Sequence, residues 1–468
     1  MIKTRTALTA AAVGATLALA ACGDAGGDTG SGDAGGDGVV AGAEPITAEE
    51  VQDLLEGDEE VEITLWAWAV TQYTPAIEAF EKAYPHIKVD FVVESGSTDM
   101  YTKYQNAVEA GTGVPDVMQW EYYAIPQYAV TGSLLNFASD SLESELAPLY
   151  NASAWNDVHV AGGLYGIPTD QGPTVMFYRQ DILDEFELEV PTTWAEVEEV
   201  GLALREADPS KSLMYLPVDT TAESFINMLR FADAAPWAVD GLTSVSLDMQ
   251  NDTVKSVSDY LRRTIDEGVI RVVSSSSDEY TRMLAEGDVV MGIHGAWRSG
   301  GIQADFPEQA GLWRAAVPPV WGDGGTQEHN SVSGGSAFAV SASSPREKQV
   351  AAVAFANWLS SDPGSVDILV EQGLFSAALS YQEDAEAAAE TSEYFGGQTV
   401  NQVFFDAANA VDPSWPTLPF MQEVHTTYTD TVLPTLSGGS DIFAAVGTWQ
   451  EQVATWAVDQ GFTITEEG

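Results

Sequence analysis

Aromatic side chains beside turn-forming residues are the part of this sequence that could do chemistry. Trp297 lies in HGAWRSGG and Trp415 in DPSWPTLP, where glycine, proline and polar neighbours make burial of the ring difficult. A flat ring packs on the C–H face of a pyranose, while nearby carboxylates and amides pair with the sugar hydroxyls. Packing in a core is the ordinary alternative for each ring. The rings in such settings are Trp68, Trp120, Tyr122, Tyr123, Trp155, Trp237, Trp297, Trp321, Phe375 and Trp415.

The sequence contains no recognisable catalytic constellation. Its five histidines show neither an HExxH pair nor another metal-ligand spacing, and neither a GxSxG elbow nor a GxxxxGK loop occurs. The 71 acidic residues offer many carboxylate pairs for glycoside hydrolysis, whose separations a sequence does not give. We therefore expect no catalytic residue, no cofactor and no metal, with a secreted carbohydrate-active enzyme as the alternative.

Residues 163–181, GLYGIPTDQGPTVMFYRQD, are the element that we expect to hold polar groups between two lobes. The residues at either end are β-branched or aromatic strand formers, whereas Pro168, Gly172 and Pro173 interrupt regular pairing. This pattern predicts a strand, a Pro/Gly-interrupted crossover with Asp170 and Gln171 at the seam, and a second strand. An ordinary β-turn with surface polar residues is the alternative.

Other segments predict an α/β fold in two lobes, because a single core rarely exceeds about 250–300 residues. Residues 63–68 and 87–93 are expected strands, joined by a helix that begins at Thr74-Pro75. A strand at residues 117–120 places Glu121, Tyr122 and Tyr123 at its carboxyl end, where open α/β sheets bind ligands. Glycine-rich residues 333–336 are a candidate second crossover and residues 373–375 a possible third.

The first 58 residues predict export and tethering. Residues 1–21 carry Lys3 and Arg5 before a short apolar run that ends in small residues, as in a signal peptide. The LAAC run resembles a lipobox, which implies that Cys22 becomes the lipidated N-terminus. The Gly/Asp-rich sequence that follows has almost nothing to bury, so residues 22–58 are assigned to a tether.

The formal charge of −53 makes nucleic acid and anionic lipid surfaces unfavourable partners. Cationic residues do not gather near the aromatic positions, which favours a neutral ligand over a phosphate or a dicarboxylate. Cys22 is the only cysteine, so an intramolecular disulfide is excluded.

Five segments in matching order resemble family 1 extracellular solute-binding proteins of bacterial ABC importers, the group that includes maltose-binding protein. They are LWAWAVTQYTPAIEAFEKAYPHIKV, AGTGVPDVMQWEYYAIPQYAVTGSLLNF, GLYGIPTDQGPTVMFYRQDIL with PTTWAEVEEV, MLAEGDVVMGIHGAWRSGG, and GGSAFAVSASSPREKQVAAVAFANWL. The resemblance implies a type II two-lobed fold, each lobe a mixed sheet flanked by helices. Crossover strands join the lobes, and a hinge closes them over a ligand.

Carried over by position, the resemblance implies these ligand contacts: Trp68, Gln72, Glu121, Tyr122, Tyr123, Asp170, Gln171, Trp297, Gly335, Ser336 and Trp415. Trp237 is added from its turn context after Ala235-Pro236, and Phe375 from the possible third crossing. Val70 stands where the maltose binder carries a charged sugar contact, which argues against simple maltose recognition.

These observations lead to one expected organisation and function. Lobe 1 is assigned to residues 59–168 with 336–374, and lobe 2 to residues 169–335 with 375–468. We expect a monomeric, non-catalytic lipoprotein on the outer face of the cytoplasmic membrane. It would bind a neutral xylo-, cello-, manno- or malto-type oligosaccharide and deliver it to the transmembrane subunits of an ABC permease. A lipoprotein sensor or adhesin is the other alternative.

Overall fold

The structure is a computed structural model that describes residues 44–94, 96–219, 221–322 and 329–466. The expected signal peptide, the lipidated Cys22 and residues 22–43 of the expected tether lie outside the described residues. Within the described ranges, no helix has both the length and the apolar composition that a membrane crossing needs.

The described residues form one nine-stranded sheet that runs through both lobes, in the order β10-β7-β11-β6-β13-β3-β1-β2, with β12 paired to β6. β1, β2 and β3 are parallel to one another, whereas β13 is antiparallel to both of its neighbours, β3 and β6. The strands are β1 (Val61–Ala67), β2 (Ile87–Val93), β3 (Val117–Glu121), β6 (Ile167–Arg179), β7 (Ser212–Pro217), β10 (Ile270–Val273), β11 (Val289–Gly295), β12 (Trp313–Ala316) and β13 (Val332–Val340).

Smaller strands lie outside this sheet. They are β4 (His159–Val160), β5 (Gly163–Leu164), β8 (Trp237–Asp240), β9 (Ser244–Leu247) and β14 (Thr463–Glu466). β8 and β9 form an antiparallel pair, and β14 adds to β9 in parallel, so the end of the described chain is fixed to lobe 2.

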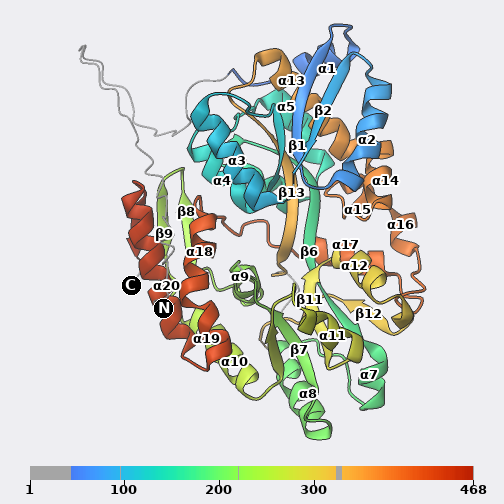
Figure 1. The fold of residues 1–468 in the computed structure, drawn as a ribbon, viewed down its shortest axis with the longest axis vertical. Coiled ribbons are helices and arrows are strands. Elements are labelled where there is room, and N and C mark those ends of the chain that lie inside the picture. The colour runs from blue at the N-terminus through green and yellow to red at the C-terminus, as the bar shows by residue number, and fades with distance from the viewer. Residues whose placement is uncertain (1–43, 95, 220, 323–328, 467–468) are drawn as a thin grey trace, which may run out of the picture.

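Helices cover the sheet in each lobe (Figure 1). Those of lobe 1 are α1 (Ala48–Glu56), α2 (Val70–Ala83), α3 (Ser97–Ala110), α4 (Ile125–Val130), α5 (Asp140–Leu146), α6 (Ala152–Asp157), α13 (Arg346–Ser361) and α14 (Pro363–Glu371). Those of lobe 2 are α7 (Gln180–Glu185), α8 (Trp194–Ala207), α9 (Glu223–Phe231), α10 (Asp252–Asp266), α11 (Asp278–Glu286), α12 (Arg298–Asp305), α17 (Val400–Asn409), α18 (Met421–Thr431), α19 (Leu433–Gly438) and α20 (Ile442–Asp459). Two short helices, α15 (Leu379–Gln382) and α16 (Ala385–Ala389), connect α14 to α17.

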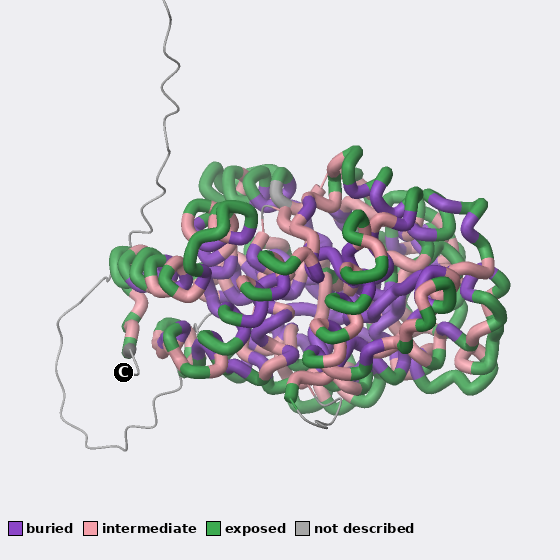
Figure 2. The backbone as a smooth tube through the Cα atoms, turned by 90° about the horizontal axis from the view of Figure 1, so that it is seen from below, coloured by how far each residue is buried: buried purple, intermediate pink, exposed green. Residues whose placement is uncertain are grey.

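The hydrophobic core is divided between the lobes. One buried cluster belongs to lobe 1 and joins residues between Ile46 and Ile167 to a second stretch between Ala337 and Ala377. Two further clusters belong to lobe 2 and begin at Val175 and Met176. Figure 2 shows the buried segments running through the middle of the molecule, with exposed helical turns outside them. The expected two-lobed α/β fold is therefore confirmed, while the lobe boundaries given above stay a prediction.

The Pro/Gly-interrupted crossover is a single uninterrupted strand, β6, which passes from lobe 1 into lobe 2 beside β13 (Figure 1). The expected break at Pro168 and Pro173 does not occur, although the pairing with β13 is irregular beside each proline. Ser333 and Gly334 of β13 lie opposite Gly172 alone, and Thr169 of β6 is an extra residue between the Asp170 and Pro168 pairs. Proline, which has no N–H to donate, is tolerated in a strand at such irregular positions.

Two other elements differ from expectation for local reasons. The Thr74-Pro75 helix start is wrong, since α2 begins at Val70 directly after the first strand and contains Pro75.

Residues counted with the tether form α1, which packs against α13. Thr47 and Glu50 make a capping box, and Arg346 reaches the Glu50 carboxylate at 2.8 Å. The folded body therefore begins before residue 58.

We expect Gly172→Ala to lower the free energy of unfolding by about 1–3 kcal/mol, as overpacking does. A Cβ on Gly172 would overlap the carbonyl oxygen of Ser333, so β6 and β13 would have to separate. Urea unfolding measures the change. Gly438→Ala is the matched control, because a Cβ there meets nothing within 4 Å. Equal stability of the two variants would contradict the close approach.

Candidate functional site

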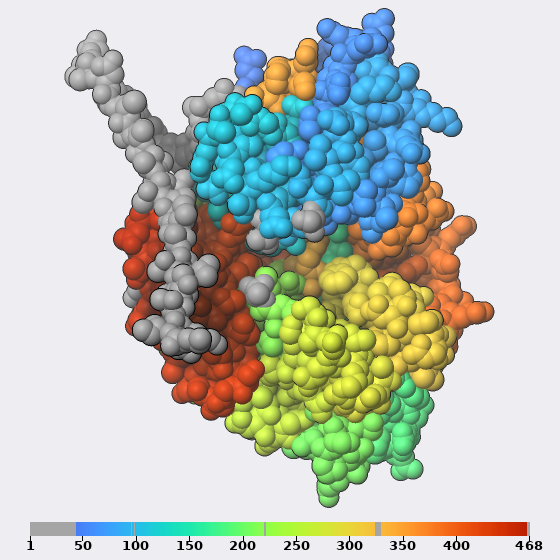
Figure 3. Space-filling view, viewed as in Figure 1, coloured from blue at the N-terminus to red at the C-terminus, as the bar shows by residue number. Residues whose placement is uncertain are grey.

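The glycine-rich start of β13, residues 333–336, is where most of the predicted ligand contacts gather. The Trp297 indole N–H donates to the Ser333 carbonyl at 2.8 Å, and the Ser336 hydroxyl donates to the Asp170 carboxylate. Gly335 has φ +102°, and a Cβ there would lie 3.0 Å from the Tyr122 ring. We call the following residues the cleft cluster: Glu121, Tyr122, Tyr123, Asp170, Glu223, Trp297 and residues 333–336. Figure 3 shows the surface hollowed between the lobes.

Asp170 is the carboxylate of the crossing strand. Burial raises its pKa to about 6, with the nearby Glu121 charge acting in the same direction and the hydrogen bonds from Ser336 opposing both. Ser336 also accepts from Gln119 Nε2 at 2.9 Å, and the Tyr122 hydroxyl donates to the Asp170 carbonyl at 2.9 Å. The position of Asp170 is therefore fixed by β3, β13 and its own strand.

Glu121 and Tyr123 extend the cluster from lobe 1 toward lobe 2. The Glu121 backbone N–H donates to the Tyr101 hydroxyl at 2.8 Å, and burial raises the pKa of the Glu121 carboxyl. The Tyr123 ring packs on both lobes and meets His425 of α18 edge-on, with 5.1 Å between ring centres. Tyr123 is thus a direct contact between the lobes in this structure.

Glu223, at the first position of α9, is a cleft residue that the sequence analysis missed. Burial is the main cause that raises its pKa to about 7, and the charges of Glu121 and Asp219 add to it. Ser333 and Gly334 hydrogen-bond to the carboxylate, but its Oε1 atom is buried without a partner among the described residues. An acidic residue in the first turn of a helix is ordinary in sequence, so no local signal marked it.

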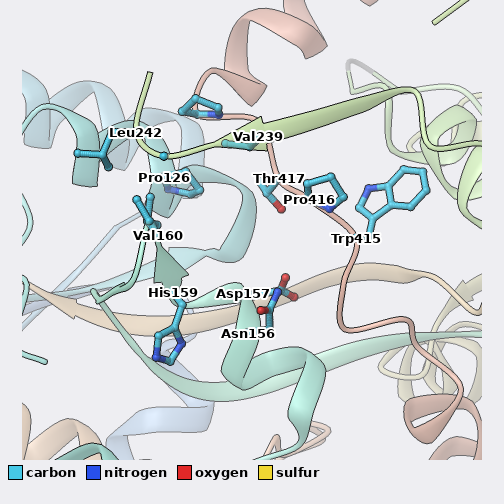
Figure 4. A pocket seen from close by; sticks show the side chains of 13 residues that line it. Pro126, Asn156, Asp157, His159, Val160, Val239, Leu242, Trp415, Pro416 and Thr417 are labelled. Atoms are coloured by element: carbon cyan, nitrogen blue, oxygen red, sulfur yellow. The ribbon is translucent and has the colours of Figure 1, made fainter. Parts of the chain in front are cut away.

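A second polar region adjoins the cleft cluster, which we call the interlobe pocket. Its volume is about 180 Å³, and both lobes contribute to it (Figure 4). Trp415 lines it from lobe 2 and Asp157 from lobe 1. Tyr122 connects the two regions, because the charges of Asp170 and Asp157 both act on its phenol, whose pKa burial raises strongly. The lining residues are Pro126, Asn156, Asp157, His159, Val160, Ala161, Val239, Gly241, Leu242, Trp415, Pro416, Thr417 and Pro419.

Three predicted contacts, Gln171, Phe375 and Trp237, are buried behind this surface or away from it. Gln171 points to the opposite side of β6 from Asp170, as alternate side chains of a strand do, and accepts from Gln382 at 3.2 Å in a buried amide network. Phe375 is buried in the third hydrophobic cluster. Trp237 is buried behind Trp415 and donates to the Pro416 carbonyl at 2.8 Å. Trp68 packs partly buried against the lobe 1 core, its backbone N–H donates to Gln119 at 3.2 Å, and it stays a predicted contact.

Gln72 lies in the first turn of α2 and is half-buried. Its side-chain oxygen accepts a hydrogen bond from the Thr71 hydroxyl at 2.7 Å. It stays a predicted contact. No finding links it to residues 333–336.

One group of side chains in the described residues could hold a metal ion. Asp233, His329 and Asp412 place their ligand atoms within 4.8 Å of one another. Asp412 already accepts two hydrogen bonds from Ser414, and its charge also acts on the nearby Arg230 guanidinium. Since a guanidinium competes with a cation for the same carboxylate, we assign no metal to this group.

We expect the stabilisation that Glu223 contributes to depend on pH around neutrality. Its pKa is about 7 in the folded protein and 4.5 ordinarily, so the folded state holds the proton more tightly. The contribution is fully present below about pH 4.5 and is lost as the pH rises through about 7. In urea unfolding, the stability of wild type relative to Glu223→Gln should fall by about 1–3 kcal/mol between about pH 5 and about pH 8. A pH-independent difference would show that Glu223 is ionised throughout.

Comparison with solved structures gives the same architecture. The chain is 28% identical to the ABC transporter associated binding protein from B. animalis subsp. lactis in complex with beta-1,6-galactobiose, over 87% of this chain and 100% of that one, with a TM-score of 0.73. The galacto-N-biose-/lacto-N-biose I-binding protein from Bifidobacterium longum is 22% identical over 88% and 100% of the chains, also with a TM-score of 0.73, and supports the fold alone.

Sequence relatives are binding proteins. A lactose-binding protein of Rhizobium radiobacter is 25% identical over 74% of this chain and 81% of its own length. An arabinooligosaccharide-binding protein of Bacillus subtilis is 23% identical over 57% of this chain and 62% of its own. Residues 75–394 match the family model of bacterial extracellular solute-binding proteins. That match covers more than half of the chain and agrees with a cleft built from both lobes, and the protein belongs to this family.

Proposed function

We propose that this protein captures a neutral oligosaccharide between its lobes and delivers it to the permease of a carbohydrate ABC importer, as an extracellular lipoprotein. The arrangement of residues 333–336 is the observation that carries the proposal. This segment contacts Trp297 and Glu223 of lobe 2 as well as Tyr122 and Asp170. A ligand placed against it touches both lobes at once, so the closed form gains contacts that the open form lacks.

The groups of the cleft cluster suit hydroxyl-rich ligands. Trp297 is 44% exposed, so its ring is free to pack on a sugar face, and its indole N–H is already held by Ser333. Asp170 and Glu223 supply acceptor oxygens for sugar hydroxyls, and the pKa of about 7 also lets the protonated Glu223 carboxyl donate a hydrogen bond near neutral pH. Buried polar groups of this kind discriminate strongly between ligands that pair with them and ligands that do not.

The relatives extend the range of sugars to be considered. The candidates expected from the sequence are xylo-, cello-, manno- and malto-type oligosaccharides. The names of the relatives add lactose, β-1,6-galactobiose and arabinooligosaccharides. The cleft cluster gathers carboxylates rather than cations, which supports a neutral sugar in all of these classes. The proposal includes a non-catalytic role, so oligosaccharides incubated with the protein stay intact. Hydrolysis would favour a carbohydrate-active enzyme instead, and absence of sugar binding would favour a sensor or an adhesin.

We expect Trp297→Ala to weaken binding of the preferred sugar by about tenfold or more, because a stacking ring is worth about 1–2 kcal/mol or more when buried by a ligand. Isothermal titration calorimetry against the panel of neutral oligosaccharides measures the loss. Trp456→Ala is the control, since this half-buried ring of α20 packs on Phe420. Wild-type affinity in Trp297→Ala would contradict a role for Trp297 in binding.

We expect Cys22→Ser to release the protein from the membrane. Two or more acyl chains on one residue anchor a protein durably, and serine does not accept the thioether-linked lipid. Fractionation of cells that express each form measures the distribution, and sugar affinity of the released protein should equal that of wild type. A membrane-bound Cys22→Ser protein would show that the lipobox assignment is incorrect.

A further inference from the structure

We propose that Asp157 of lobe 1 and Arg230 of lobe 2 together hold one uncharged sugar residue of the ligand in the interlobe pocket, with a sugar hydroxyl donating to the carboxylate and a sugar oxygen accepting from the guanidinium. This inference rests on the proposed function. It adds the residues that select a neutral ligand over a charged one. The pair would discriminate against sugars that carry a carboxylate.

Asp157 is placed to receive a ligand hydroxyl. It ends α6, lines the interlobe pocket, and points in Figure 4 from α6 toward the loop that carries Trp415 and Thr417. Burial raises its pKa to about 6, and the charge of Arg230 opposes that shift. A desolvated carboxylate without a donor costs free energy, which a hydroxyl donor from a ligand removes.

Arg230 is the complementary group. It lies on α9 with its guanidinium carbon 5.3 Å from the centre of the Trp415 ring, and Trp415 lines the pocket. Its Nε atom is buried and has no hydrogen-bond partner among the described residues. Burial lowers its pKa, whereas the charges of Asp157 and Asp412 raise it. The Arg230 guanidinium therefore packs against a residue of the pocket lining, with its Nε donor unpaired among the described residues.

Asp157 and Arg230 act on each other electrostatically but form no ion pair within the part of the chain that the structure describes. Asp157 lines the interlobe pocket of about 180 Å³, and Arg230 packs on Trp415, another residue of its lining. Whole-ligand pockets usually measure about 300–1,000 Å³, so this one has room for a single sugar residue while the remainder of an oligosaccharide lies along the cleft cluster.

The charge of the surroundings decides between a neutral and an acidic sugar. The Arg230 guanidinium is opposed by the carboxylates of Asp157 and Asp412. An additional carboxylate brought in by a uronic acid would meet a net negative site with little water to screen it. A hydroxyl group satisfies donor and acceptor together without adding charge, and the Trp415 ring offers an apolar surface for the C–H face.

The test compares three variants by calorimetry and by thermal unfolding: Asp157→Asn, Arg230→Gln and the control Arg263→Gln. Arg263 belongs to the same lobe and also lies over an aromatic ring, 5.7 Å from the centre of Tyr260, but pairs with Glu198 on the surface. The probes are the neutral panel of lactose, β-1,6-galactobiose and arabino-, xylo-, cello-, manno- and malto-oligosaccharides. Aldobiouronic acids serve as the acidic probes.

We expect Asp157→Asn and Arg230→Gln each to weaken binding of the best neutral probe by about tenfold or more, and Arg263→Gln to leave it within about threefold. Wild type should bind the aldobiouronic acids at least about tenfold more weakly than neutral sugars. Without sugar, Asp157→Asn should melt at the same or a higher temperature, because it removes a buried carboxylate from a helix C-terminus.

Three outcomes would overturn the inference, and each differs from a failure of the proposed function. Near-wild-type affinity in both pocket variants, with Trp297→Ala still weakened, would leave the sugar site standing and remove this pair from it. Tighter binding of an aldobiouronic acid would reverse the charge argument. A lower melting temperature of ligand-free Asp157→Asn, with unchanged affinity, would make the pair a direct contact between lobes. If no sugar binds wild type, the proposed function itself fails.

Discussion

The close contact of two crossing strands is the constraint on which the rest of this structure depends. β6 and β13 pass between the lobes with their backbones so near that position 172 tolerates no side chain beside Ser333. The same two strands carry Asp170 and Ser336, which face each other in register and are joined by a hydrogen bond. The crossing between the lobes and the Asp170 carboxylate of the cleft cluster are therefore parts of one ladder.

Burial of charge is the second feature that organises the cleft. Asp170, Glu223 and Asp157 all have raised pKa values for the same first reason, loss of hydration, and the donors available to them are few. Such groups are better hydrated when the lobes separate, which favours an open form in the absence of ligand. Under the proposed function, a ligand with many hydroxyls would supply the missing partners and favour the closed form. The desolvation of these carboxylates on closure would therefore affect both the affinity for the ligand and the equilibrium between the open and closed forms.

Sequence reasoning recovered the parts of the site that follow from strand ends and glycine-rich segments. Residues 121–123 come at the carboxyl end of β3, and the start of β13 was marked by its glycines, so local pattern was enough. The continuity of β6 was not predictable, because the irregular pairing beside Pro168 and Pro173 depends on a partner strand more than 150 residues later. Gln171 was chosen with Asp170 as a neighbour in sequence, although a strand turns successive side chains to opposite faces.

The cleft and pocket residues that the sequence did not reveal are charged groups, and their environment is set by the tertiary structure. With 71 acidic residues in the chain, Asp157 and Glu223 look like any other carboxylates until folding buries them. Basic residues are scarce, 18 in all, and Arg179, Arg263 and Arg346 each have an acidic partner within 4 Å. Arg230 instead lies over Trp415 with a buried donor unpaired, in a protein where acceptors are abundant everywhere. A buried donor without a partner costs free energy, and a ligand that reached the Arg230 guanidinium would remove part of that cost.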